Sequence, residues 1–188
     1  MTIMTENTKI QLVKSKRQKP VSDFFNKIYL IRGLPGSGKT TVANDINPVI
    51  NDPNFIFRAA TDDWFVDSDG KYKFNPSDLV VNHAACLDWF KDRVGKALGG
   101  NTIIIHNTFT MYWELHPYIN HMKGKENFRI TVLDVFDGGL TDAELAERNT
   151  HGVGKASIER MRDRWVPWSL KDYYHYVGGI ESYGNRWA

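Results

Sequence analysis

One eight-residue motif limits what this chain can fold into. Residues 33–40 read GLPGSGKT and match the phosphate-binding pattern G-x-x-x-x-G-K-[ST] in full. A short apolar run at 28–31 precedes the motif, and the residues from Thr40 to about Ile46 are expected to form a helix that stops before Pro48. This order of strand, glycine-rich turn and helix is the setting in which the motif holds nucleotide phosphates. The chain is therefore expected to bind a nucleoside triphosphate, with ATP the expected nucleotide, together with Mg²⁺.

Each part of the motif has a chemical task. Gly36 and Gly38 allow the backbone to turn so that successive N–H groups face one anion. Lys39 is expected to reach the outer phosphates, and Thr40 to give its hydroxyl to Mg²⁺. The expected ATP-binding residues are Gly33, Pro35, Gly36, Ser37, Gly38, Lys39, Thr40 and Thr41, with Arg148 from a later segment.

The remaining pattern predicts strands that alternate with helices. Such alternation is typical of a parallel sheet covered on both faces, so we expect a three-layer α/β/α fold. Further strands are expected at 55–60, 102–105 and 128–135, and further helices at 76–98, from about Met111, from Thr141 and at 155–165. Thr108 or Thr110 is expected to cap the helix near Met111, unless these residues contact substrate.

The longest expected helix opens at Asn75-Pro76 and has one apolar face. Its residues recur at spacings of three or four, which predicts that this face is buried. The face comprises Leu79, His83, Cys86, Phe90 and Val94. We interpret His83 as a core histidine, with a substrate contact at the pocket wall as the alternative, and Cys86 as a small core residue rather than a nucleophile.

Two carboxylates follow the second expected strand. Ligands bind beyond the carboxyl ends of the strands in an open parallel sheet, so Asp62 and Asp63 are expected on the same edge as the phosphate loop. Asp62 is the first choice for a general base that accepts the proton of an acceptor hydroxyl. Asp63 is the second choice, and it could instead help to hold Mg²⁺ or contact substrate. The alternative for either residue is a capping role in a short turn.

Polar residues also end the third expected strand. His106 stands where many phosphate-loop enzymes carry a carboxylate that orients Mg²⁺, and imidazole is a poor ligand for that ion. The metal is therefore expected to depend on Thr40 and Asp63. Asn107 and Thr108 are candidate substrate contacts, as is Trp64 after the acidic pair.

A basic, glycine-containing stretch at about 140–168 is expected to form a helical lid. An arginine there would neutralise the charge that builds up during phosphoryl transfer, and Arg148 is the choice for that role. An aromatic segment, 165–188, follows; it is expected to cover a sheet edge or to stack on a base.

Charge and cysteine content bound the remaining possibilities. The net charge is +2, which excludes recognition of nucleic acid by bulk charge alone, yet residues 1–20 carry five Lys and Arg against one Glu. We expect a flexible basic arm at 1–22, before a kinase domain at 23–188. One cysteine and the lack of an apolar run of membrane-spanning length favour a cytoplasmic protein without membrane contact. The sequence leaves the oligomeric state open.

These motifs together resemble a family of small phosphate-loop kinases. The resemblance rests on GLPGSGKTT, the DD pair at 62–63, the HNTFT stretch at 106–110 and the RN-x-HGV stretch at 148–153, and it covers about residues 27–168. The family includes the 5′-kinase domain of phage polynucleotide kinase and domains like that of NEDD4-binding protein 2. The resemblance implies that Lys39 and Thr40 bind ATP and Mg²⁺, that Asp62 is the general base and that Arg148 is the lid arginine.

The resemblance implies an ATP-dependent kinase that phosphorylates a 5′-hydroxyl of DNA or RNA. Polynucleotide kinase carries a basic residue just past its acidic pair, where this chain has Trp64, Phe65 and Val66. Of these, Trp64 and Phe65 would suit stacking on an extruded base. The alternative is therefore a phage-type enzyme that phosphorylates 5-hydroxymethyluracil in DNA. A nucleoside or small-metabolite kinase and a non-catalytic ATP-binding adaptor are further alternatives.

Overall fold

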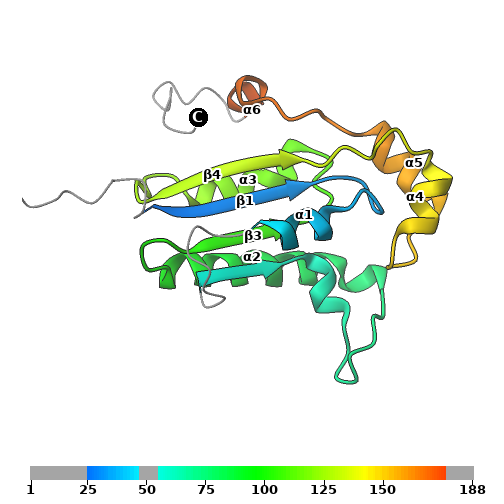
Figure 1. Cartoon of the computed structure of the whole chain (residues 1–188), viewed down its shortest axis with the longest axis horizontal. Helices are drawn as coiled ribbons and strands as arrows, with labels where there is room; N and C mark the ends of the chain where they lie inside the picture. Colours follow the sequence, from blue (N-terminus) through cyan, green and yellow to red (C-terminus); the bar gives the residue numbers. More distant parts are fainter. Residues whose placement is uncertain (1–24, 47–54, 177–188) are drawn as a thin grey trace, which may run out of the picture.

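The fold is built around four parallel strands. The computed structural model describes residues 25–46 and 55–176. The strands are β1 (Asn26–Arg32), β2 (Ile56–Ala59), β3 (Thr102–His106) and β4 (Phe128–Asp134), and they lie in the order β2-β3-β1-β4. All three pairings are parallel, so the carboxyl ends of the strands meet at one edge of the sheet (Figure 1).

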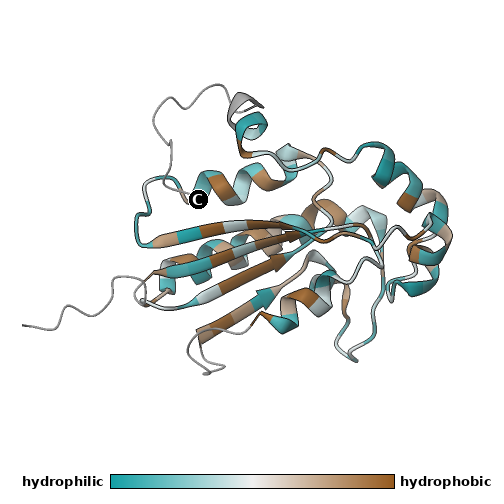
Figure 2. Ribbon diagram, turned by 45° about the horizontal axis from the view of Figure 1, so that its top comes forward, coloured by the Kyte–Doolittle hydropathy of each residue, from teal (hydrophilic) through white to brown (hydrophobic). Residues whose placement is uncertain are grey.

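Helices cover both faces of this sheet. On one face, α2 (Leu79–Lys96) and α3 (Tyr112–His121) bury their apolar sides against β1 and β3. On the other face, Ala43 of α1 (Lys39–Asp45) packs against Ile31 and Ile104. The three-layer α/β/α arrangement predicted from the sequence is therefore confirmed. Figure 2 shows the apolar residues concentrated in the strands, as expected for strands buried on both faces.

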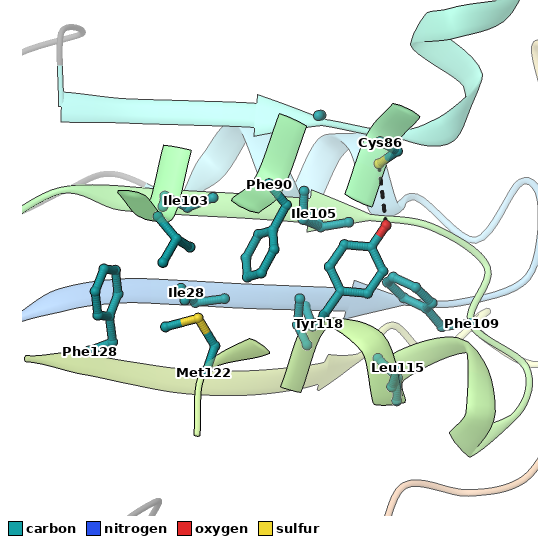
Figure 3. Close-up of a cluster of buried hydrophobic side chains, with 13 residues drawn as sticks. Ile28, Cys86, Phe90, Ile103, Ile105, Phe109, Leu115, Tyr118, Met122 and Phe128 are labelled. Atoms are coloured by element: carbon teal, nitrogen blue, oxygen red, sulfur yellow. Dashed lines mark hydrogen bonds between the residues drawn. The ribbon is translucent and has the colours of Figure 1, made fainter. Parts of the chain in front are cut away.

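The largest of the three core clusters lies between the sheet and α2 and α3 (Figure 3). Phe90 of α2 meets the ring of Tyr118 of α3 edge-on, with 5.2 Å between the ring centroids. Tyr118 also donates a hydrogen bond to the Cys86 sulfur at 3.5 Å. The interpretation of Cys86 as a core residue agrees with its complete burial.

The beginning of α2 departs from the prediction. Leu79 and His83 were expected on the buried face, but both are exposed. The sheet does not extend under the first turns of α2, which pack instead on the 3-10 helix η3 (Thr61–Phe65). There the His83 Nδ1 lies 3.0 Å from the Thr61 hydroxyl, and Asn82 donates to the carbonyl of Trp64. The buried face therefore begins at Cys86.

Two other predicted boundaries also shift. The N-cap of α3 is Met111, so the prediction that Thr108 or Thr110 caps it is wrong. The Glu114 carboxylate supplies the missing partner, because it accepts from the Met111 N–H and from the Thr110 hydroxyl. The helix predicted at 155–165 is α5 (Lys155–Asp163), which ends two residues earlier than expected.

A buried arginine lies at the end of β1. Arg32 is fully buried, and its Nη2 donates to the carbonyl oxygens of Val166 at 2.7 Å and Thr110 at 3.3 Å. Asp134 and the ring of Trp165 supply a negative charge and an aromatic face for the guanidinium. Burial lowers the pKa of Arg32, and the charge of Asp134 opposes this effect. The backbone carbonyl of Arg32 also accepts from the Val135 N–H.

Three short helices and a 3-10 turn complete the described chain. They are η4 (Pro76–Asp78), α4 (Asp142–Arg148), α6 (Leu170–Tyr176) and α5. The Asn75 side chain, expected to cap the long helix, caps η4 just before α2, and the Thr141 side chain caps α4 as predicted. The predicted arm at 1–22 lies outside the described residues, as does the aromatic segment beyond Tyr176. No helix within the described residues has the length and apolarity needed to cross a membrane.

The burial of Cys86 leads to a test of the fold. Cys86 is the sole cysteine of the chain, and burial raises the pKa of its thiol. We expect a thiol reagent such as DTNB to react with the native protein only through unfolding, so that the rate rises with urea in parallel with the unfolded fraction. A Leu98→Cys, Cys86→Ala variant, whose thiol replaces an exposed side chain, should react at once. Rapid labelling of Cys86 in the native protein would contradict this packing.

Candidate active site

The phosphate loop connects β1 to α1 at the carboxyl edge of the sheet. Gly36 and Gly38 have positive φ angles of 78° and 97°, which side chains rarely tolerate. Within the described part of the chain, the backbone N–H groups of these two glycines have no hydrogen-bond partner. The Ser37 hydroxyl is buried and likewise unpaired among the described residues. A loop of unpaired donors fits a bound polyphosphate, whose oxygens would satisfy them.

Lys39 begins α1 and is folded back over the loop. Its ammonium group donates to the Leu34 carbonyl at 3.0 Å. Burial lowers the pKa of Lys39 to about 8, and the negative charge of Asp62 opposes that shift. A phosphate anion at the loop would stabilise the charged ammonium. Lys39 is thus placed to bind phosphate and is within electrostatic reach of Asp62.

The lid segment predicted at 140–168 lies directly on this loop. It comprises α4 and α5, which stand beyond the carboxyl ends of the strands (Figure 1). Leu34 of the loop packs with Leu145 of α4 and Ile158 of α5 in a separate small core. A Cβ atom at Gly36 would meet the Leu145 carbonyl oxygen, so glycine is required there by space as well as by conformation.

The predicted acidic pair lies in η3, immediately after β2. Asp63 uses one carboxylate oxygen to accept from the Ala60 N–H at 2.8 Å, so it caps this short helix while its side chain remains exposed. Asp62 has a different environment. Its Oδ1 accepts from the Tyr72 hydroxyl at 3.1 Å, and its Oδ2 lies 3.6 Å from His151 Nε2. The side chain of Asp62 is 44% exposed, so an acceptor hydroxyl can reach it.

Sequence reasoning missed Tyr72 and His151. Tyr72 belongs to a hairpin in which Val66 and Tyr72 form an antiparallel bridge, and His151 belongs to the turn between α4 and α5. The RN-x-HGV stretch contained His151, but nothing in its spacing indicates that it meets a residue 89 positions earlier. Tyr72 lies in a polar loop with no helical or strand periodicity. No sequence signal pointed to it.

The other predicted substrate contacts lie on the inner side of η3. Asn107 is buried: its Oδ1 accepts from the Thr61 N–H at 2.7 Å, and its Nδ2 lies 3.8 Å from the Cys86 sulfur. Contact with an acceptor would compete with these bonds. The Thr108 carbonyl accepts from Gly33 of the phosphate loop. Trp64 is half-buried against the large core cluster, and His83 pairs with Thr61.

Two further predicted residues, His106 and Arg148, differ in how far they are buried. His106, at the end of β3, is half-buried; burial lowers the pKa of its imidazole, and the nearby charge of Asp63 opposes that change. Arg148, at the end of α4, is exposed, and its side chain makes no hydrogen bond or ion pair with the described residues. Another lid arginine, Arg162, is instead bound to Asp137 and Asp142, each at 2.7 Å.

The donor set for a metal ion is sparse in the protein itself. Among the described residues, no group of three or more His, Cys, Asp and Glu side chains is arranged to hold a metal. Thr40 and Asp63 are both exposed near the loop. Such a set suits Mg²⁺, which keeps several waters and uses phosphate oxygens as ligands when it binds with a nucleotide.

Comparison with known proteins agrees with this fold. The chain is 31% identical over 160 residues to human NEDD4-binding protein 2, and the match covers 79% of this chain and 8% of that protein. A chain of the solved Pnkp1/Rnl/Hen1 RNA repair complex superposes with a TM-score of 0.54 at 19% identity, covering 86% of this chain and 48% of that one. The sequence relation and the shared fold support a P-loop kinase-like family for this chain.

The matches cover very different shares of the relatives. The chain spans less than a tenth of NEDD4-binding protein 2. A sugar kinase from Janibacter sp. HTCC2649 superposes with a TM-score of only 0.46 at 14% identity, covering 78% of this chain and 80% of that one. No protein-family model matches the chain. The comparisons therefore agree with the fold and support a kinase-like family, and the acceptor is argued from the site.

The contact between the loop and the lid gives a paired test. Gly36 and Gly124 have nearly equal φ angles of 78° and 76°, but only Gly36 lies against another backbone. Gly124→Ala should lose about 1–2 kcal/mol of unfolding free energy, the cost of a side chain in the left-handed region. Gly36→Ala should lose more and should expose the 140–168 segment to limited proteolysis. Equal losses in urea unfolding, with an unchanged proteolysis pattern, would show that the lid does not rest on Gly36.

Proposed function

We propose that this protein is an ATP-dependent kinase that transfers the γ-phosphate to a hydroxyl group of a nucleic acid, with a 5′-hydroxyl as the acceptor. The single observation that carries the proposal is the position of Asp62. Its carboxylate is partly exposed, lies within electrostatic reach of Lys39, and stands on the same sheet edge as the phosphate loop. A base beside a phosphate-binding loop is the arrangement that phosphoryl transfer to a hydroxyl requires.

In this proposal the residues divide the work between two substrates. The loop N–H groups, the Ser37 hydroxyl and Lys39 hold the triphosphate of ATP, and Thr40 and Asp63 hold Mg²⁺ with it. Asp62 accepts the proton of the acceptor hydroxyl, whose oxygen forms the new bond to the γ-phosphorus while the bond to the β-phosphate oxygen breaks and ADP leaves. Arg148, unpaired among the described residues, is free to neutralise the transferring group.

The choice of acceptor rests on two further considerations. Phosphorylation of a base in DNA was favoured by stacking on Trp64 and Phe65, but Phe65 is 4% exposed and Trp64 packs against the core. That argument for a base acceptor is therefore lost. The fold shared with a chain of an RNA repair complex, together with the basic residues at 1–22, makes a nucleic-acid end the first acceptor to test.

A substitution at Asp62 tests the proposed base. Asp62→Asn should lower the rate of transfer by roughly 10²–10⁴-fold, because the amide cannot accept the proton, while ATP affinity stays within several-fold. Radiolabelled transfer and isothermal titration calorimetry measure the two quantities. Asp163→Asn, at the exposed end of α5, is the matched control and should retain the parent rate. Transfer at the parent rate by Asp62→Asn would eliminate this residue as the base.

An acceptor panel tests the proposed function itself. Labelled ATP and Mg²⁺ are offered with 5′-hydroxyl DNA and RNA, DNA containing 5-hydroxymethyluracil, free nucleosides and no acceptor. We expect label on the 5′ end, located by nuclease digestion, and none with Lys39→Ala. Label on a base or a nucleoside would support the alternative kinases. Tight ATP binding without any labelled product would support a non-catalytic adaptor.

A further inference from the structure

Two loops from distant parts of the chain meet at Asp62. The hairpin at 66–73 brings Tyr72, and the turn between α4 and α5 brings His151. The two rings lie 4.5 Å apart between centroids, with an interplanar angle of 44°. Each ring contacts a different oxygen of the same carboxylate. The Tyr72 hydroxyl donates to Oδ1, and His151 Nε2 lies beside Oδ2. We call Tyr72 and His151 the carboxylate clamp.

The hairpin holds Tyr72 in place through its own bonds. The Lys73 N–H donates to the Phe65 carbonyl at 2.7 Å, and the Asp67 N–H donates to the Lys71 carbonyl at 2.9 Å. An ion pair of 2.7 Å joins Asp67 to Lys73 across the hairpin. The Tyr72 ring also packs on the buried Phe65 at 6.1 Å. Its hydroxyl is therefore directed at Asp62 by a braced loop.

The lid holds His151 in a similar way. The Asn149 amide closes the turn on both sides, because it donates to the Val153 carbonyl at 2.9 Å and accepts from the Val153 N–H at 2.8 Å. Gly152, with a φ of 69°, completes the turn, and His151 lies at its tip. The Nδ1 atom of His151 is buried and has no partner among the described residues, so the contact with Asp62 is the polar contact that the ring makes there.

We propose that the carboxylate clamp positions Asp62 for proton transfer, and that the lid supplies one of its two residues, His151. This inference rests on the proposed function. A carboxylate has about four lone-pair positions, and the clamp residues face two of them. The others remain for the acceptor hydroxyl. With Oδ1 hydrogen-bonded to Tyr72 and Oδ2 beside the imidazole of His151, rotation of the carboxylate is restricted. Because His151 comes from the lid that covers the phosphate loop, the base is fully oriented only when that lid is closed. Tyr72 and His151 are positioning residues, since both act through Asp62.

The central test separates the rate of transfer from substrate binding. His151→Ala should lower kcat by about 10–100-fold, the effect of a misplaced catalytic group, without changing ATP affinity. His151→Gln keeps an N–H donor of similar reach and should recover most of the rate. Tyr72→Phe keeps the ring and removes the hydroxyl, so it should lower kcat by several-fold. His116→Gln and Tyr29→Phe, which lie away from the site, should match the parent.

A second measurement distinguishes orientation from general damage. In an Asp62→Asn background, His151→Ala and Tyr72→Phe should cause no further loss of the residual rate, because there is no base left to orient. Further losses of the original size would overturn the proposal. If His151→Ala does not fold, as judged by circular dichroism, the Gln and Phe variants carry the same comparison. Parent-like kcat in both single variants would also overturn it.

A third measurement is independent of any transfer activity. Hydrogen exchange of the peptide covering 149–153, without nucleotide, should be several-fold faster in Asp62→Ala and in Tyr72→Ala than in the parent, because these substitutions remove the carboxylate and the ring that His151 contacts. Unchanged exchange would remove the physical contact on which the clamp depends. If the clamp passes this test and the parent transfers phosphate to no acceptor, the proposed function fails and the contact stands.

Discussion

The arrangement of the site depends on one close backbone contact. The lid approaches the phosphate loop so closely that the Leu145 carbonyl occupies the space where a Cβ atom of Gly36 would lie. Leu34 extends the contact by packing with Leu145 and Ile158. Because α4 is docked in this way, the turn that follows it reaches Asp62, a residue from the other side of the loop. One glycine thus permits the phosphate loop, the lid and the acidic residue to share a site.

Behind Asp62 lies a layer of polar contacts centred on two buried residues, Thr61 and Asn107. Asn107 holds the Thr61 backbone, the Thr61 hydroxyl meets His83 of α2, and Asp63 caps η3, the short helix that begins at Thr61. Buried polar groups that satisfy one another make a rigid support. Residues that would serve as substrate contacts on sequence grounds are, in the described structure, largely the support for the one carboxylate in front of them.

The sequence was sufficient where a local pattern carries the information. The motif at 33–40 and the apolar runs predicted the loop, the parallel sheet and the sheet edge that carries Asp62. Helical spacing indicated which face of α2 is apolar but not how far the sheet extends beneath it, and so Leu79 and His83 were misplaced. Thr110 was misjudged because Glu114, one turn later, competes for the same bonds. Tyr72 and His151 meet only through tertiary packing, which spacing along the chain does not encode.

Arg32 has a consequence for how the lid segment can vary. The Arg32 carbonyl accepts a hydrogen bond from the Val135 N–H, and the Arg32 guanidinium donates one to the Val166 carbonyl. Both ends of the segment between Val135 and Val166 are therefore bound to one residue of β1. The segment between Val135 and Val166 therefore leaves the sheet and returns to it at the same residue. The two contacts that fix its ends do not involve the residues between them. A lid of different length or sequence could therefore replace this segment between the same two points without disturbing the register of the sheet.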